Sequence, residues 1–232
     1  MFSRFLTAIA AALVLSASAS YAATPKAAIT PKAAATPAPK PHGAEVAFVS
    51  SIQQDLMARF PTATDAEKAG YFRYTNEDNT GAISYTNLKW ASADSKSPSQ
   101  LWYDVNGNLL GADFSVLQSD SPKPPHLWGI NPARWQNFEE HVHFVVTDAA
   151  AKESYGGTSM KKFVAAGGDP KDPQAAAVVK MGKAKDEAAV SHVFVFPAVW
   201  DLIVWVKENP NGAFAEKNPL VKPSATAEKD SM

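Results

Sequence analysis

The residues of this chain best suited to chemistry are histidines on two apolar segments. His141 and His143 alternate with apolar residues in residues 141–146 (HVHFVV), and His192 lies in a second such segment, SHVFVF. Side chains two apart on a strand point to the same side, so His141 and His143 would lie roughly 6–7 Å apart on one face. That spacing lets both imidazoles reach one metal ion or one small polar ligand.

A metal site follows if the two histidine strands are neighbours. Three nitrogen ligands from His141, His143 and His192, with a fourth position open, form the arrangement of catalytic zinc, and copper also accepts imidazole. The carboxylates that could orient a ring or act as a base are Glu139, Glu140 and Asp201. Because His-x-His is a common motif, a purely structural role for these histidines is the alternative.

A proline-containing loop before the histidine strand adds two further candidates, His126 and Trp128 in residues 119–130. An imidazole beside an aromatic ring is typical of a pocket wall, and packing of Trp128 in the core is the alternative. A small-ligand pocket built from all these candidates would use His126, Trp128, His141, His143, His192 and Asp201.

Asp201 stands inside the apolar segment 198–206 (AVWDLIVWV). A carboxylate so placed needs a basic group, a capped backbone or a ligand. The valine and isoleucine content of the segment and its alternation favour a strand over a helix. Asp113 lies on the face opposite Phe114 in another expected strand, and the sequence assigns it to no particular site.

The helices and strands that are expected to position these residues indicate an α+β fold with a mostly antiparallel sheet. Apolar residues recur at helical spacing over residues 43–60, and residues 64–67 have the pattern of a capping box, so a pair of N-terminal helices is expected. The Asn-Gly pair at 106–107 predicts a hairpin. The strands expected around it are residues 82–91, 100–105 and 108–117.

The rest of the domain is expected to combine short helices with the two histidine strands. Asn131 is a suitable cap, so residues 131–140 are predicted to be a short helix that runs into the first histidine strand. Residues 148–190 are predicted to be helical and loose, with helices over 159–166 and 173–181 that pack on the sheet.

Composition divides the chain into four segments. Residues 1–23 have the positive start, short apolar run and small terminal residues of a secretory signal peptide, which predicts export to the periplasm or the extracellular medium. Residues 24–42 are rich in Ala, Pro and Lys and are expected to be a flexible linker. Residues 43–222 then form a single globular domain, followed by a polar tail over residues 223–232.

Composition also excludes several classes of protein. The chain has no cysteine, so its core and not disulfides must hold it together. Of its 22 basic residues, 21 remain without Arg4 and face 23 acidic ones, a balance that gives no electrostatic footprint for nucleic acid. No apolar run after the signal reaches membrane-spanning length, so the mature chain is expected to be soluble.

Three functions agree with these features. The first is an exported domain that binds a small molecule in a pocket of histidines and aromatic rings. The second is a metal-dependent, zinc-type hydrolase that uses the same histidines. The third is a non-catalytic structural or assembly protein of the cell envelope that uses a sheet edge for contact. The sequence leaves open whether the chain is an enzyme and whether it forms a homo-oligomer.

Overall fold

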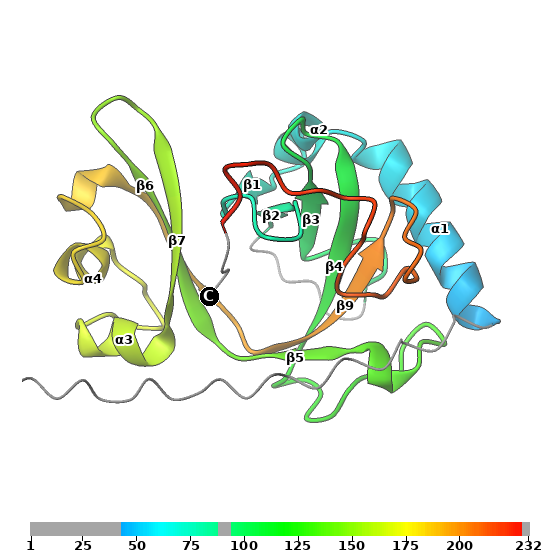
Figure 1. Ribbon diagram of the computed structural model, residues 1–232. Helices are drawn as coiled ribbons and strands as arrows, with labels where there is room; N and C mark the ends of the chain where they lie inside the picture. Colours follow the sequence, from blue (N-terminus) through cyan, green and yellow to red (C-terminus); the bar gives the residue numbers. More distant parts are fainter. Residues whose placement is uncertain (1–42, 88–93, 229–232) are drawn as a thin grey trace, which may run out of the picture. The chain divides into compact units, whose positions relative to one another are not determined.

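The computed structural model describes residues 43–87 and 94–228, which form an α+β fold with two antiparallel sheets (Figure 1). The six-stranded sheet has the order β1-β2-β3-β4-β9-β5, and the three-stranded sheet has the order β7-β6-β8. The predicted α+β class with an N-terminal helix pair is confirmed. The predicted signal peptide and linker, and the end of the strand expected over 82–91, lie outside the described residues.

The described residues belong to one compact unit. No helix within them has both the length and the apolar character that crossing a bilayer requires. In chain order the helices and strands are α1 (Ala44–Arg59), α2 (Ala63–Lys68), β1 (Phe72–Arg73), β2 (Ile83–Thr86), β3 (Gln100–Tyr103), β4 (Leu109–Leu117), η1 (Pro132–Arg134), β5 (Gln136–Phe138), β6 (His141–Thr147), β7 (Glu153–Ser159), α3 (Met160–Ala165), α4 (Ala175–Lys180), η2 (Glu187–Ala189), β8 (Val190–Phe196) and β9 (Val199–Trp205).

Helix α1 covers one face of the six-stranded sheet (Figure 1) and builds the largest core with it. Its buried side chains Val49, Ile52 and Leu56 recur at helical spacing. The strand residues in the same core include Leu101, Tyr103, Ala112, Phe114, Leu202 and Val204. Alternate residues of a strand point to opposite faces, so the intervening side chains of β3, β4 and β9 point away from α1.

Helix α2 begins earlier than its sequence pattern predicts. Thr62 is the N-cap, and Thr64 lies inside the helix. The Thr62 hydroxyl accepts a hydrogen bond from the Asp65 amide at 3.3 Å and donates one to the Asp65 carboxylate at 2.6 Å. Asp65, three residues after the cap, therefore takes the place that the sequence pattern gave to a glutamate.

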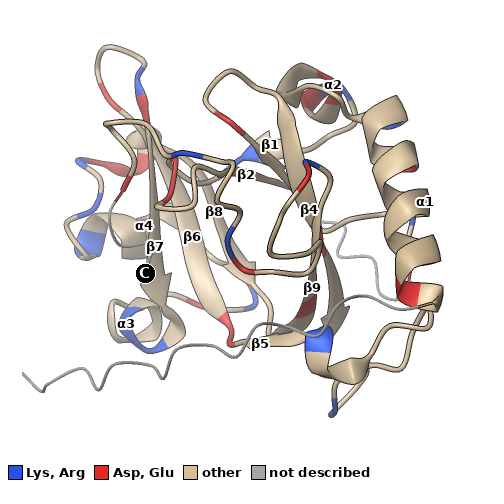
Figure 2. Cartoon of the chain, turned by 45° about the vertical axis from the view of Figure 1, so that its right-hand side comes forward, with Lys and Arg blue, Asp and Glu red and all other residues tan. Residues whose placement is uncertain are grey.

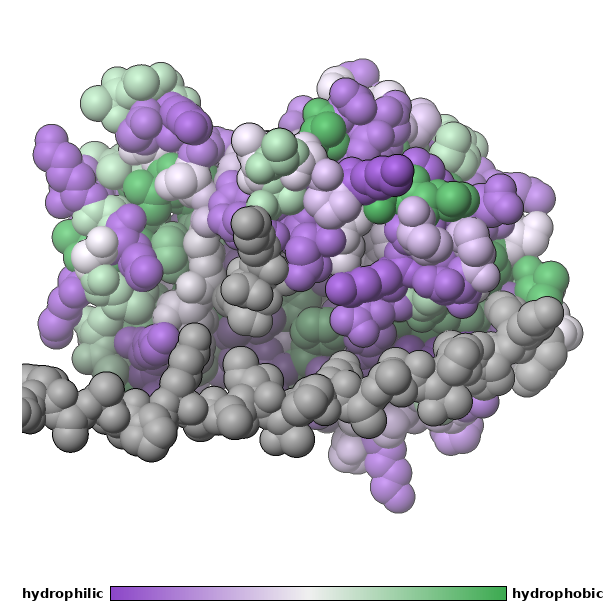
Figure 3. Space-filling view, in the orientation of Figure 1, coloured by the Kyte–Doolittle hydropathy of each residue, from purple (hydrophilic) through white to green (hydrophobic). Residues whose placement is uncertain are grey.

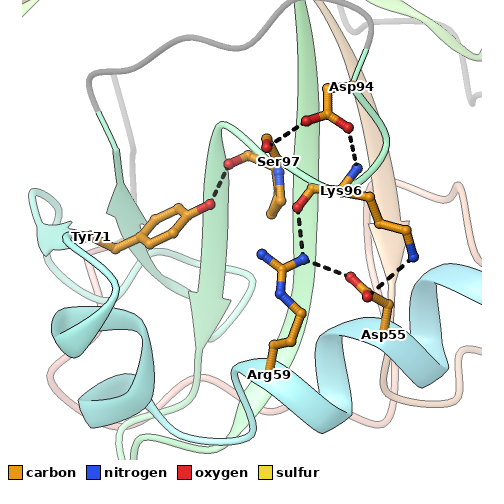
Figure 4. Close-up of polar contacts among 7 residues, drawn as sticks. Asp55, Arg59, Tyr71, Asp94, Lys96 and Ser97 are labelled. Carbon is orange, nitrogen blue, oxygen red and sulfur yellow. Dashed lines mark hydrogen bonds and ion pairs between the residues drawn. The ribbon is translucent and has the colours of Figure 1, made fainter.

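A network of charged side chains joins the last turn of α1 to residues 94–98 (Figure 4). The carboxylate of Asp55 accepts hydrogen bonds from Arg59 at 2.7 Å and from Lys96 at 3.2 Å. Burial alone would raise the pKa of Asp55, but these two hydrogen bonds outweigh it and lower the pKa. Tyr71 adds a hydrogen bond to the carbonyl of Pro98 at 2.6 Å, so this loop is held at several points.

The chain passes between the two sheets through two pairs of strands. Only two residues separate β5 from β6, and two separate β8 from β9. Phe138 pairs with Val199 in the six-stranded sheet, and His141 pairs with Phe196 in the three-stranded sheet. Pro197 lacks the N–H that a ladder hydrogen bond needs, which favours a break at this point. The strand that carries the histidines thus meets the strand that carries Asp201 at the junction of the sheets.

The prediction of a helix over residues 131–140 is wrong beyond the first turn. Asn131 is the cap, and its side-chain oxygen accepts a hydrogen bond from the Ala133 amide at 3.0 Å. Only the 3-10 turn η1 follows, because Gln136–Phe138 then pairs with β9 as β5. This pairing supplies the backbone hydrogen bonds that a continued helix would have made within itself.

Residues 148–190 were predicted to be helical and loose, but part of this region forms strand β7. It pairs with β6 along its whole length, and Gly156 lies opposite Phe144. A β-carbon at Gly156 would lie 2.4 Å from an edge carbon of the Phe144 ring, so the glycine leaves room for that ring. Glycines in a strand weaken the alternation of apolar and polar residues by which a strand is predicted, and this explains why β7 was not predicted from the sequence.

Replacing Gly156 with alanine should lower the free energy of unfolding by about 1–3 kcal/mol, because the added methyl group overlaps the Phe144 ring. Urea denaturation measures this loss. The same substitution in a Phe144→Leu background should cost clearly less, since the smaller side chain leaves space. An equal loss in both backgrounds would show that the overlap is not its cause.

After β9 the chain first packs in the α1 core through Phe214 and then returns across the other face of the six-stranded sheet. Val221 packs in a small core with Trp205, and Trp205 donates a hydrogen bond to the carbonyl of Ala215 at 2.6 Å. Further on, the Ser224 amide donates to the Glu77 carboxylate at 2.7 Å. The start of the expected polar tail is therefore hydrogen-bonded to the domain.

Candidate functional site

A pocket of about 810 Å³ lies at the junction of the two sheets and combines aromatic rings with carboxyl groups. The rings are Tyr74, Trp102, Phe138, Phe196 and Trp205, and the carboxyl groups belong to Asp78, Asp113, Glu139, Glu140, Asp201 and Glu216. Lys217 is the one lysine or arginine among the described residues that line it. The pocket also receives His141 and His143 from β6.

Asp113 and Asp201 reach this pocket from adjacent strands. Asp113 on β4 pairs with Ile203, and Asp201 on β9 pairs with Ser115. The two carboxyl groups are therefore diagonal neighbours on the same face of the sheet. They are 7% and 1% exposed, so both are removed from bulk water.

Each of the two carboxyl groups accepts a hydrogen bond from a neutral side chain. Trp102 donates its indole N–H to Asp113 Oδ2 at 3.1 Å. The Ser115 hydroxyl donates to Asp201 Oδ1 and is also hydrogen-bonded to Ser99. Among the described residues neither carboxyl group forms an ion pair. The partner that Asp201 was expected to need is thus a hydroxyl group within the sheet.

Burial raises the pKa of both carboxyl groups. For Asp113, burial and then the negative charge of Asp201 hold the pKa well above its usual range. For Asp201, burial raises the pKa to about 7 against the opposing effect of the Ser115 hydrogen bond. Two poorly solvated carboxyl groups of like charge ionise one at a time, so this pair retains a proton near neutral pH.

His141 and His143 form a second pair of interacting groups in the pocket. Their Nε2 atoms lie 3.1 Å apart, so one ring donates a hydrogen bond and the other accepts it. His141 Nδ1 also lies 2.7 Å from the carbonyl oxygen of Glu139. The His141 ring stacks on Phe196, and the edge of the His143 ring meets Tyr74, each at 4.7 Å between centroids. Aromatic neighbours therefore hold both imidazoles in place.

The two histidines are uncharged at neutral pH. Burial and then the charge of His141 lower the pKa of His143 to about 3. Burial also lowers the pKa of His141, although the hydrogen bond with the Glu139 carbonyl opposes it. The deep part of the pocket thus contains neutral imidazoles beside a carboxyl pair that holds a proton.

Acid should destabilise the protein through His143. Because its folded-state pKa lies below the ordinary 6.5, its contribution to stability is present above pH 6.5 and is lost as the pH falls toward about 3. Between pH 7 and pH 4, His143→Gln should gain on the order of 3 kcal/mol relative to the wild type. Urea denaturation across this pH range measures the difference.

The matched control for this prediction is His192→Gln, since His192 is an exposed histidine on the adjacent strand β8. The unfolding free energy of this control should follow the wild type across the pH range. If His143→Gln also runs parallel to the wild type, His143 does not carry the acid sensitivity.

The structure does not bring the third predicted imidazole, His192, to the other two. Phe194 occupies the position opposite His143, and His192 pairs with Val145 further along β6. The exposed His192 ring stacks on Phe72 at 4.6 Å. Among the described residues no three His, Cys, Asp or Glu side chains are arranged to hold a metal ion. The predicted convergence of three imidazoles is therefore not formed.

The two loop candidates also lie outside the pocket lining. His126 is exposed. The Trp128 ring stacks on Phe48 of α1 at 5.2 Å and meets Phe114 at 5.9 Å, so it packs against the main core on the opposite face of the sheet. Core packing, the alternative stated for Trp128, is what the structure shows.

Three residues that sequence reasoning placed at no site complete the pocket. Tyr74 and Gln100 are hydrogen-bonded to each other through the Tyr74 hydroxyl, and Asp113 lies on the strand beside Gln100. Alternation along β3 and β4 places Gln100 and Asp113 on the face away from α1. Such a face is ordinarily solvated, and only the strands of the second sheet turn it into a pocket wall.

Comparison of the chain with protein-family models, curated proteins and solved structures finds no match. The fold and the site therefore define the protein only by class: an α+β protein with an acid-rich pocket where two antiparallel sheets join.

Proposed function

We propose that this protein is an exported small-molecule-binding protein and that the pocket at the sheet junction is its binding site. The burial of Asp113, Asp201 and His143 around an open pocket supports this proposal. Burying such groups without an ion pair costs stability, so a ligand explains their position around the pocket better than packing does. Aromatic walls with a few convergent polar groups are the usual composition of small-ligand sites.

Titration of the purified protein with a chemically diverse set of cations, anions, sugars and apolar compounds tests this proposal. Tryptophan fluorescence should report binding, because Trp102 and Trp205 line the pocket. The ligand-induced change should be reduced in Trp102→Phe, in which Trp205 still reports binding, and kept in full in Trp128→Phe, because the Trp128 ring lies outside the pocket. If no compound of any class changes the fluorescence or the melting temperature, the proposal is wrong.

Export is supported by the signal-like composition of residues 1–23. When the full chain is produced in a host with a secretory pathway, it should accumulate in the exported fraction. N-terminal sequencing should find a mature protein that begins at Ala23 or Thr24. A cytoplasmic product that keeps the first 23 residues would contradict export.

The two alternative functions receive less support. A zinc-type hydrolase would require a third ligand beside His141 and His143, and the described residues do not provide one there. An envelope assembly protein would be favoured by a broad apolar surface. Figure 3 shows hydrophilic and apolar residues intermixed on the face in view, and Figure 2 shows basic and acidic residues interspersed along the chain. The pocket therefore remains the feature that best indicates a function.

A further inference from the structure

The lining of the pocket favours a positively charged ligand. Six carboxyl groups and one lysine line it. Asp113 and Asp201 are the two buried acids, whereas the other acids are half-buried or exposed and so lie nearer to solvent. A cleft lined by one sign of charge concentrates ligands of the opposite sign. An anionic ligand would meet repulsion from most of these groups and attraction only from the exposed Lys217.

The buried polar atoms of the pocket favour a ligand that donates hydrogen bonds. Trp102 and Ser115 each donate to one oxygen of a buried carboxyl group, which leaves the second oxygen of Asp113 and of Asp201 to accept from a ligand. Hydrogen bonds from a cationic N–H to a carboxylate are about twice as strong as those between neutral groups. A primary ammonium group carries three such N–H donors on one compact charge.

The aromatic walls define the rest of the ligand. Trp102 and Trp205 meet edge to face at 5.5 Å, and Tyr74 and Phe196 line the same pocket. Aromatic faces attract an organic cation and also pack against its apolar body. From this juxtaposition of buried acids and aromatic rings we infer that the ligand is a primary ammonium ion on a compact apolar or aromatic body. The inference rests on the proposed function of this pocket.

Binding of such a cation is coupled to a proton. Below about pH 7 the Asp201 carboxyl group of the free protein is protonated, and a bound cation favours the Asp201 carboxylate, so binding releases the Asp201 proton to solvent. Affinity should then rise with pH through the pKa of Asp201, about 7. Of the groups that face the pair, Tyr74 has a pKa raised by burial, while burial lowers the pKa of His141 and His143. None of these three gains or loses a charge near pH 7.

The remaining charged groups around the pocket are Asp78, Glu139, Glu140, Glu216 and Lys217. They come from the loop before β2, from the junction of β5 with β6, and from the segment after β9.

Isothermal titration with matched pairs of primary amine and alcohol tests the inference. The pairs share a butyl, a benzyl or a 2-phenylethyl body and differ only in the charged group. At pH 8 at least one amine should bind tenfold or more tightly than its alcohol. At pH 6 its affinity should be about tenfold weaker, with release of about one proton measured in buffers of different ionisation enthalpy.

Asp201→Asn should abolish the pH dependence of amine binding and most of the preference over the alcohol. Asp55→Asn, the same change at an acid outside the lining, should leave both unchanged. Circular dichroism and the melting temperature establish that Asp201→Asn is folded, and Asp113→Asn serves as the second variant if it is not. Retention of both properties in the folded variant overturns the inference.

The outcomes separate this inference from the proposed function. If alcohols bind as well as amines, or if only sugars, anions or apolar compounds bind the pocket, the ammonium inference is overturned and the binding function stands. If no compound of any class binds, the proposed function fails and the inference fails with it.

Discussion

Replacing Glu45 with alanine should lower the free energy of unfolding by about 3–5 kcal/mol, the largest single effect expected in this protein. The Glu45 side chain is fully buried and lies 3.2 Å from the guanidinium of Arg134, which is 6% exposed. Glu45 also accepts a hydrogen bond from the Asn131 amide at 3.1 Å. Without this carboxylate, the Arg134 guanidinium stays buried but loses the group that accepts its hydrogen bonds, and the Asn131 amide loses its acceptor. The interactions that join α1 to η1 are then removed.

Asp55→Ala is the matched control, because it removes another acid of α1 that pairs with an arginine. Asp55 and Arg59 are 17% and 40% exposed, so this loss should be under about 1 kcal/mol. Urea denaturation of both variants measures the contrast. Replacing Glu45 and Arg134 together with leucine and methionine should cost less than Glu45→Ala alone. Similar losses for Glu45→Ala and Asp55→Ala would mean that burial of the pair has little consequence.

The second large effect expected is a loss of stability as the pH rises, removed by Asp201→Asn. Because the folded-state pKa of Asp201 is raised, its contribution is fully present below the ordinary 3.8 and is lost as the pH rises through about 7. Moving from 3.8 to about 7 corresponds to on the order of 4 kcal/mol. Between pH 4 and pH 8, the wild type should lose about this much relative to Asp201→Asn.

Comparing the wild type with the variant at each pH isolates Asp201 from His143, whose contribution changes in the opposite direction below pH 6.5. Asp55→Asn is the control, because the pKa of Asp55 is lowered and its carboxylate is already charged over most of this range. Calorimetric melting from pH 4 to pH 8 measures all three proteins. Parallel curves for the wild type and Asp201→Asn would show that this carboxyl group ionises freely in the folded protein.

Local patterns were sufficient to predict several elements. The helical spacing of Val49, Ile52 and Leu56 corresponds to α1, whose buried face contacts the sheet. The Asn-Gly turn joins β3 to β4 as predicted. The alternation around Asp201 corresponds to β9, with Leu202 on the α1 side and Asp201 on the pocket side. These features are predictable because neighbouring residues alone set the period of a helix or a strand.

The candidate site was only partly predictable. The two-residue spacing of His141 and His143 placed both rings on one face, and the structure finds them in contact. The same reasoning grouped them with His192, because it contained no information on which residue of β8 pairs with which residue of β6. The observed register sets Phe194 opposite His143 and so moves His192 away from the pair. Register depends on contacts between distant parts of the chain.

The sequence by itself determined the period of the main elements, the face of each strand that carries polar groups, and the absence of disulfides. Only the tertiary structure decided that Asp113 and Asp201 lie side by side, that a second sheet covers them, and that Glu45 meets Arg134. The physical reason is that alternation is a local steric property of the backbone. The pairing of β4 with β9 and the junction between the sheets instead arise from packing between residues far apart in the chain.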